Sequence, residues 1–325
     1  MPLARRARPA SAAAAGLGLL GLLTACGGAS EPASSASSAG SAAASAASTS
    51  AAVAIEGLPA MQADPALSAT LPSEVKSEGT VTVGTNAPFP PYEMFTSDSD
   101  QTIIGLEADL GHAIGNLLGV TFDLVQQPFD GLIPALQAGK HDVIMSTLFD
   151  TADREKVVDM VNYSASGSGI LVATGNPGGI KTSADLCGKT VAVQTGSAQV
   201  AIVKGFNAAC SGSEVMIKSL PQYTDELLAL STGSADAVVG DIPAMSYSLA
   251  EKVNTGKFEL VTDPAQPNGY DSAPVGIAVA KGSGLTEPIR GALQKLMDDG
   301  TYTTLLKKWD VPQIAIDAVT VNAAS

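Results

Sequence analysis

The stretch Phe129–Ser146, FDGLIPALQAGKHDVIMS, contains a complete helix–turn–strand unit. Its apolar residues first recur at helical spacing, a glycine then ends the helix, and the run Asp142–Met145 predicts a buried strand. The chain repeats this arrangement in Asp225–Asp241, DELLALSTGSADAVVGD, where Ala235–Gly240 is the predicted strand. Two copies of one unit predict two α/β lobes of similar construction.

Further strands and helices alternate around these two units. We expect strands at Thr80–Thr85, Thr121–Gln126 and Lys189–Val193, and helices over Leu106–Leu118 and from Ala198 onward. Such alternation predicts largely parallel sheets, which bind ligands beyond the carboxyl ends of their strands. The positions selected by this rule are Asn86, Ser146, Thr147, Gln194, Ser197 and Asp241.

The N-terminus has the features of an export signal. The basic segment RRAR (residues 5–8) precedes the apolar run Gly16–Leu23, which is too short to span a bilayer as a helix. The residues Leu23–Cys26, LTAC, look like the lipobox of bacterial lipoproteins, in which the cysteine becomes the first residue and carries the lipid. A cysteine that follows small residues by chance is the alternative. We expect an exported chain, anchored by lipid at Cys26 to the outer face of the cell membrane.

The segment after the lipobox is rich in alanine and serine. Residues 29–55 contain too few large apolar side chains to offset the entropy of ordering them, which is typical of a tether. We therefore expect residues 1–25 to be a signal peptide, residues 26–78 to be a lipidated tether, and folded sequence to begin near Gly79.

Three cysteines and two histidines limit the chemistry of the chain. If Cys26 is lipidated, one pairing is left, and export to an oxidising compartment favours a disulfide between Cys187 and Cys210. Neither cysteine has a histidine nearby, and no metal-binding spacing is present, so we expect no catalytic thiol, metal site or cofactor. We expect His112 and His141 to lie on the surface.

The overall charge excludes one class of partner. Lys and Arg number 18 against 32 Asp and Glu, a formal net charge of −14. Binding to nucleic acid depends on neutralising phosphates with basic side chains. We therefore expect no nucleic-acid partner.

Two features of the sequence indicate a bound anion. Backbone N–H groups at a helix start that follows a glycine turn bind anions, and Ser197 lies at such a start, although it could equally be a structural N-cap. Arg154 lies in the first turn of a helix that begins near Asp150 or Thr151, where a cation opposes the helix dipole. Either a neighbour such as Asp153 or a ligand carboxylate would then hold the arginine.

Several segments of the sequence match a known protein family. The run Phe129–Ser146, followed by the Thr-x-x-Arg pattern of Thr151–Arg154, resembles family 3 extracellular solute-binding proteins of amino-acid ABC transporters. The segments VGTNAPFPPYE, GLEADLGHAIG, DLCGKTVAVQTGSAQ and DGTYTTLLKKW match the family in the same order, so that the resemblance covers roughly residues 79–311.

The resemblance implies an α/β fold of the type II periplasmic-binding-protein kind. Each of its two lobes is a mixed, mostly parallel sheet flanked by helices, and two hinge segments join them, near Ala165–Leu171 and Pro264–Ala273. The implied organisation is residues 79–168 for the first part of lobe 1, 169–268 for lobe 2, and 269–325 for the return segment and C-terminal helices of lobe 1.

The resemblance implies ligand-binding roles for individual residues of this chain. The resemblance implies that Arg154 grips the ligand α-carboxylate and that Asp241 binds its α-ammonium group. Ser146 and Thr147 match the first-lobe serine positions of the family, and Ser197 matches the helix-start hydroxyl of the second lobe. Phe89 and Phe129 match the rings that flank the ligand side chain, with core packing as their alternative.

Three positions depart from the family pattern. Phe149 replaces a serine and Ala198 replaces a threonine, which puts the usual carboxylate cradle in doubt. Members that bind basic amino acids often carry an acidic residue where Asn86 stands, so we expect a ligand without a cationic side chain.

These observations predict that the protein is the substrate-binding component of an ABC importer. We expect a monomer that delivers a small polar solute to a membrane permease. A non-basic amino acid is the expected solute. The alternatives are a cyclohexadienyl-dehydratase-like enzyme on the same fold and a sensor subunit. The enzyme needs a positioned acid, for which Glu93 and Asp241 are the candidates near strand ends. We expect no enzymatic activity.

Overall fold

The computed structural model describes residues 52–97 and 99–324. The predicted signal peptide, the predicted lipidation site Cys26 and residues 26–51 of the predicted tether lie outside the described residues. The described residues form one compact unit.

Most strands of this unit belong to a single mixed sheet with the order β4-β1-β5-β11-β6-β9-β7-β8. β10 and β12 pair with β6, and β2 pairs with β3 in a separate ribbon. The strand bounds are β1 Thr80–Thr85, β2 Met94–Ser97, β3 Asp100–Ile104, β4 Thr121–Gln126, β5 Val143–Phe149, β6 Val158–Ala173, β7 Thr190–Gln194, β8 Met216–Leu220, β9 Ala237–Asp241, β10 Phe258–Leu260, β11 Tyr270–Ala280 and β12 Thr320–Val321.

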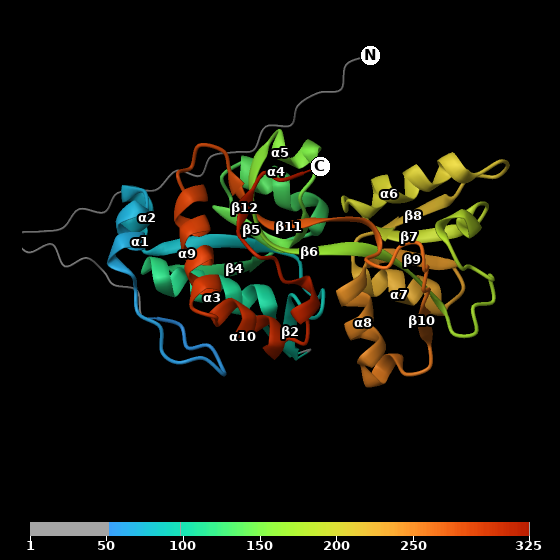
Figure 1. Ribbon diagram of the computed structural model, residues 1–325, viewed down its shortest axis with the longest axis horizontal. Coiled ribbons are helices and arrows are strands. Elements are labelled where there is room, and N and C mark those ends of the chain that lie inside the picture. The colour runs from blue at the N-terminus through green and yellow to red at the C-terminus, as the bar shows by residue number, and fades with distance from the viewer. Residues whose placement is uncertain (1–51, 98, 325) are drawn as a thin grey trace, which may run out of the picture. The chain divides into compact units, whose positions relative to one another are not determined.

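The long strand β6 divides the sheet into two lobes, because its two halves have different neighbours. From Val158 to Ser168 it pairs with β11, whereas from Ser168 to Val172 it pairs with β9. In the first lobe β4, β1 and β5 are parallel, and in the second lobe β8, β7 and β9 are parallel. Figure 1 shows β6 running from one lobe into the other. The predicted two-lobed α/β fold is confirmed.

Helices cover the faces of the sheet in both lobes. The first-lobe core is closed by α3, α9 and α10, and the second lobe has separate apolar clusters beneath α6 and beneath α7 and α8. The helix bounds are α1 Pro65–Thr70, α2 Ser73–Glu78, α3 Leu106–Leu118, α4 Leu132–Gln137, α5 Ala152–Glu155, α6 Gln199–Phe206, α7 Tyr223–Ser231, α8 Ile242–Ala250, α9 Thr286–Asp298 and α10 Thr301–Lys308. None of the helices in the described part of the chain has the length and apolar content needed to cross a membrane.

Folded structure begins earlier than Gly79, which corrects the sequence prediction. The helices α1 and α2 precede this glycine, and both Ile55 and Leu71 are buried in the first-lobe core. Asp64 caps α1 by accepting hydrogen bonds from the backbone N–H groups of Ala66 (2.9 Å) and Leu67 (3.3 Å). The few apolar residues of this region are buried against α3 and α9. The composition of the segment alone did not predict this burial.

The prediction that both histidines lie on the surface is wrong for His141. Its side chain is buried and lies against Gly84 of β1, where an added Cβ would come within 2.8 Å of the ring. Burial lowers the pKa of His141, so the ring is neutral at pH 7. The burial results from a tertiary contact with β1, which the turn-like sequence around His141 does not reveal.

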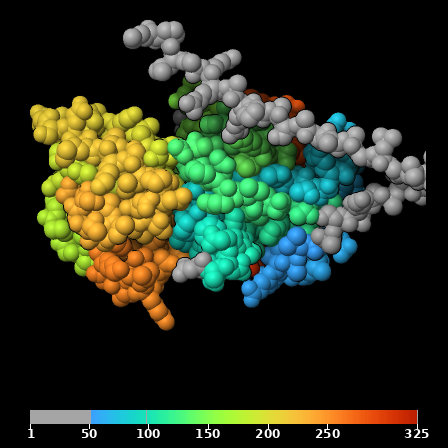
Figure 2. All heavy atoms as spheres, turned by 180° about the vertical axis from the view of Figure 1, so that it is seen from behind, coloured from blue at the N-terminus to red at the C-terminus, as the bar shows by residue number. Residues whose placement is uncertain are grey.

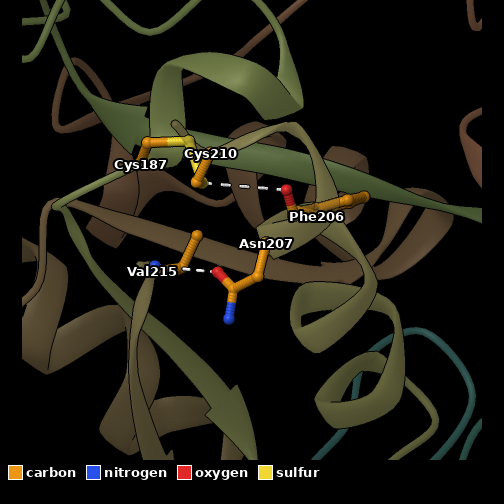
Figure 3. Close-up of a disulfide and its surroundings, with 5 residues drawn as sticks. All are labelled: Cys187, Phe206, Asn207, Cys210 and Val215. Atoms are coloured by element: carbon orange, nitrogen blue, oxygen red, sulfur yellow. Dashed lines mark hydrogen bonds between the residues drawn. A yellow bond between two sulfur atoms is a disulfide. The ribbon is translucent and has the colours of Figure 1, made fainter. Parts of the chain in front are cut away.

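The predicted disulfide between Cys187 and Cys210 is present, with 5.5 Å between the two Cα atoms (Figure 3). It lies beside α6, where the Oδ1 atom of Asn207 accepts a hydrogen bond of 2.9 Å from the backbone N–H of Val215. The disulfide and the Asn207 side chain together fix the position of the segment that connects α6 to β8.

Removing this disulfide is expected to lower the free energy of unfolding by about 3 kcal/mol, because the cross-link restricts the unfolded chain across a separation of 23 residues. Urea unfolding of the Cys187→Ser/Cys210→Ser double variant, compared with the oxidised protein, measures the loss. The double variant should also be insensitive to reductant, whereas the wild type should not. Equal unfolding midpoints for both proteins would contradict this expectation.

Candidate functional site

An enclosed pocket lies between the two lobes, where the strand ends of both sheets meet. Side chains of both lobes line it. From the first lobe these are Asn86, Phe89, Glu93, Phe129, Ser146, Thr147 and Phe149; from the second they are Gln194, Ser197, Gln199, Tyr223, Glu226, Val239, Gly240 and Asp241.

The two lobes touch each other around this pocket. Gln194 Nε2 donates a hydrogen bond of 2.8 Å to Asn86 Oδ1 across the lobes. The rings of Phe89 and Tyr223 meet edge to face with 5.2 Å between their centroids. In Figure 2 the atoms of the second lobe, yellow to orange, lie against those of the first, cyan to green. The structure is therefore a closed form, in which a bound solute would be shielded from water.

Asn86 has its own protein partners. Its Nδ2 donates to the carbonyl of Gln127 (2.9 Å) and its Oδ1 accepts from Gln194, so both ends of the amide are used within the protein. Its backbone N–H donates to Ser146 Oγ (3.0 Å). The side chain thus links the two lobes.

Three buried carboxyl groups line the pocket, and no Lys, Arg or His is among the described residues that do so. Glu93, Glu226 and Asp241 are each at most 2% exposed. Burial raises the pKa of Glu93 and of Glu226 well above the usual range, and it raises the pKa of Asp241 to about 6. A cation placed among these groups would restore their ionised form, so the pocket is electrostatically suited to positive charge.

Glu93 belongs to a buried acidic pair in the first lobe. Its Oε1 accepts from Ser146 Oγ (3.0 Å), while the neighbouring Glu107 of α3 accepts from the backbone N–H of Thr147 (2.9 Å) and from the Tyr163 hydroxyl. The charge of Glu107 adds to burial in raising the pKa of Glu93. Glu107 therefore fixes β5 through its carboxylate, and Glu93 both interacts with Glu107 and lines the pocket.

Asp241 is held by backbone and hydroxyl donors at the start of α8. Its Oδ1 accepts from the backbone N–H of Ala244 (3.0 Å), and its Oδ2 accepts from the hydroxyl of Ser166. This N-cap places the carboxylate at the carboxyl end of β9. Because these donors favour the ionised form, they moderate the rise in the pKa of Asp241 that burial causes.

Several polar atoms of the lining have no hydrogen-bond partner among the described residues. They include Thr147 Oγ1 and Ser197 Oγ, both buried. Buried polar atoms in native proteins are almost always paired. Their position around one pocket indicates that a polar ligand is their partner.

Arg154 lines a neighbouring groove and not the enclosed pocket. Its Nη1 donates to the carbonyl of Phe149 (2.8 Å), its Nη2 donates across the lobes to the carbonyl of Gly196 (3.2 Å), and its guanidinium lies 5.9 Å from the ring centre of Phe129. The charge of Asp150 partly offsets the lowering of the Arg154 pKa by burial.

The expected neighbour Asp153 instead pairs with Lys156 (2.6 Å). Ala198 lies beside Arg154 in the same groove and is the N-cap of α6. The other predicted ligand-binding residues all line the enclosed pocket.

The sequence prediction missed the second-lobe residues Gln199, Tyr223 and Glu226, and it considered Glu93 only as an acid for catalysis. One signal was available. Glu226 lies at helical spacing among residues that turn out to be buried, namely Tyr223, Ala229 and Leu230. A carboxyl group on the apolar face of a helix is costly unless it has a function there.

The chain is similar to known proteins over most of its length. Residues 81–312 match the family described as bacterial extracellular solute-binding proteins, family 3. The arginine-binding protein ArgT of Corynebacterium glutamicum is 33% identical over 262 residues, which are 79% of this chain and 83% of that protein.

Solved structures show the same relationship. An ancestral arginine-binding protein bound to arginine is 36% identical, with a TM-score of 0.63 over 71% of this chain and 98% of that one. An ancestral amino acid-binding protein described as a precursor of cyclohexadienyl dehydratase is 32% identical, with a TM-score of 0.62 over 73% of this chain and 97% of that one.

Proposed function

Because the chain belongs to family 3 of the bacterial extracellular solute-binding proteins, it is the solute-binding protein of an amino-acid ABC transporter, and we propose that its ligand is a basic amino acid of the arginine type. In this proposal the pocket closes over the ligand, and the closed form delivers it to the membrane permease.

The observation that carries the proposal is the charge of the pocket. Glu93, Glu226 and Asp241 line it without a basic side chain to balance them. Two positive groups of a basic amino acid, the α-ammonium group and the side-chain cation, would meet two or more of these carboxylates. The flanking rings of Phe89, Phe129 and Tyr223 offer faces against which a guanidinium group can stack.

This proposal differs from the non-basic ligand expected from Asn86. That expectation assumed that the residue at this position sets the charge of the site. Asn86 is bonded to Gln127 and Gln194, whereas acidic groups enter the pocket from Glu93 and Glu226. The relatives named as arginine-binding proteins support the same conclusion.

Ligand-dependent melting tests the proposal. The purified protein is unfolded and refolded to remove any bound solute, and is then melted with each common amino acid in turn. A ligand that binds only the folded protein raises the melting temperature by mass action. Arginine, and to a smaller extent lysine, should give the largest shifts. A large shift with a neutral or acidic amino acid, and none with arginine, would contradict a basic ligand.

Close contact between the lobes makes Gly196 a test of closure. Its φ is +82°, and an added Cβ would lie 3.0 Å from the Cα of Asp130 in the other lobe. Gly196→Ala is expected to weaken arginine binding about tenfold, since the close contact of the added Cβ with Asp130 costs roughly 1–3 kcal/mol and falls on the closed form. Isothermal titration calorimetry measures the loss.

Gly233→Ala is the matched control. Gly233 also has a positive φ, +69°, but nothing lies within 4 Å of its added Cβ. This variant should lose stability through backbone strain and keep its affinity for arginine. Equal affinity losses in the two variants would contradict a closure contact at Gly196.

We also propose that a lipid on Cys26 anchors the protein to the outer face of the cell membrane, because the sequence before it has the features of a lipoprotein signal. The Cys26→Ser variant is expected to leave the membrane fraction and appear in the soluble exported fraction. Incorporation of labelled palmitate into the wild type, and not into the variant, measures the modification directly. A variant that remains membrane-bound would contradict the anchor.

A further inference from the structure

Glu226 is a buried acidic side chain on α7, in the second lobe. It is 2% exposed, and it lines the pocket together with Tyr223, which precedes it by about one helical turn on the same helix face. The ring of Tyr223 meets that of Phe89 in the other lobe, so this face of α7 is turned toward the first lobe. Glu226 therefore points into the space between the lobes.

The carboxyl group of Glu226 has no hydrogen-bond or cationic partner within the part of the chain that the structure describes. Burial and the charge of Asp225 both raise its pKa, and no protein donor counteracts them. Acidic residues are common in the first turn of a helix because they interact favourably with the helix dipole, and the half-buried Asp225 meets that preference. A fully buried carboxyl group without a partner is costly, so the position of Glu226 indicates a bound group that pairs with it.

The other two acidic groups of the pocket already have partners in the protein. Both carboxylate oxygens of Asp241 accept hydrogen bonds from donors around the start of α8. Glu93 accepts a hydrogen bond of 3.0 Å from Ser146 Oγ and interacts with the neighbouring Glu107. Of the three, Glu226 is the one whose two oxygens accept no hydrogen bond from the described residues.

Two unused oxygens suit Glu226 to a guanidinium group, which binds a carboxylate most strongly through two parallel N–H···O bonds. Resting on the proposed basic ligand, we infer that Glu226 binds the side-chain guanidinium group of arginine through both carboxylate oxygens and thereby sets the preference for a cationic side chain. Asp241 remains for the α-ammonium group. Asn86 is uncharged and is bonded to two protein groups, so the charge that selects the side chain comes from α7.

Citrulline tests the role of Glu226, because it has nearly the shape of arginine but carries a neutral urea group in place of the guanidinium group. Titration calorimetry with the refolded full chain gives the dissociation constants of both ligands for the wild type and for Glu226→Gln. An effect of the substitution on lobe closure alters both affinities alike and cancels in their ratio. The wild type should prefer arginine by at least about 30-fold, and this preference should fall by at least about 30-fold in Glu226→Gln, because the buried cation is left unpaired.

Asp225→Asn is the matched control. Asp225 is the neighbour of Glu226 on the same helix but does not line the pocket, and its substitution changes the net charge by the same amount. This variant should keep the wild-type preference for arginine. An equal fall in both variants would overturn the inference, because the net charge and not a contact would then set the preference. Thermal melting without ligand verifies that each variant is folded.

The remaining outcomes separate the role of Glu226 from the proposed function. A preference in Glu226→Gln within about tenfold of the wild-type value overturns the inference, and so does a wild-type preference below about 30-fold, whatever the variants do. Loss of the preference in Glu93→Gln, and not in Glu226→Gln, would assign the guanidinium group to Glu93. In each of these cases arginine still binds and the proposed function stands. Failure of the wild type to bind either ligand overturns both.

Discussion

Replacing Asp241 by asparagine is expected to weaken the binding of arginine by at least about 30-fold. Asp241 is the buried carboxylate at the carboxyl end of β9, and in the proposed complex it faces the ligand ammonium group. Removing one partner of a buried, hydrogen-bonded charge pair costs about 2–5 kcal/mol, since the other charge is left unpaired. At about 1.4 kcal/mol for each factor of ten, this corresponds to a loss of about 30-fold to several thousand-fold.

Asparagine suits this test because it preserves the local structure. It has nearly the shape of aspartate, and it is an equally good N-cap for α8, so the hydrogen bond from the backbone N–H of Ala244 can remain. Asp123→Asn is the matched control, because Asp123 is exposed on β4 and the substitution changes the net charge by the same amount. The control should bind arginine like the wild type. An Asp241→Asn protein with wild-type affinity would show that Asp241 does not contact the cation.

The same substitution is expected to stabilise the ligand-free protein at neutral pH. Folding raises the pKa of Asp241 from 3.8 to about 6 through burial. A carboxyl group of this kind contributes its full stability below pH 4, while it is protonated in both states, and the contribution is lost as the pH rises through 6. At about 1.4 kcal/mol for each pKa unit, the loss is on the order of 3 kcal/mol.

Asparagine cannot ionise, so the Asp241→Asn variant should not lose this stability as the pH rises. Urea unfolding of the ligand-free wild type and variant at pH 4 and at pH 7.5 measures it. The difference between the two proteins isolates Asp241 from the other titrating groups. The variant should gain stability relative to the wild type as the pH rises. A difference that is constant with pH would mean that Asp241 is not desolvated in the folded protein.

Taken together, the two expectations describe one property of the site. The acidic groups that would attract a cation are destabilising without it, because each ionised carboxylate is buried away from water. Bound ligand would offset this cost, which makes ligand affinity and ligand-free stability change in opposite directions at Asp241.

Local patterns in the sequence were sufficient to predict much of the fold. The strand Thr80–Thr85 and the helix over Leu106–Leu118 were predicted with the bounds that the structure has. Helical and strand periodicities depend on neighbouring residues, so they can be read without the tertiary structure. The start of the fold was predicted too late, because the burial of Ile55 and Leu71 depends on distant helices.

The candidate site was only partly predictable for the same reason. Parallel sheets place their carboxyl ends at one edge, so strand order pointed to Asn86, Ser146 and Asp241 around the pocket. Glu226 and Tyr223 lie on a helix, so the rule that ligands bind beyond the carboxyl ends of strands does not predict them. Glu93 follows a proline-rich loop that returns to the strand ends only in the folded chain.

The sequence by itself determined the two α/β lobes, their strand ends, and the pair of cysteines that form the disulfide, because periodicity, turn residues and composition are local properties of the chain. Only the tertiary structure decided the charge of the pocket and the position of Arg154. Both depend on how the lobes meet: Glu93 and Glu226 come from different lobes, and the hydrogen bond from Arg154 to Gly196 joins one lobe to the other. Burial and desolvation, which set the electrostatics of the site, are properties of that assembled arrangement.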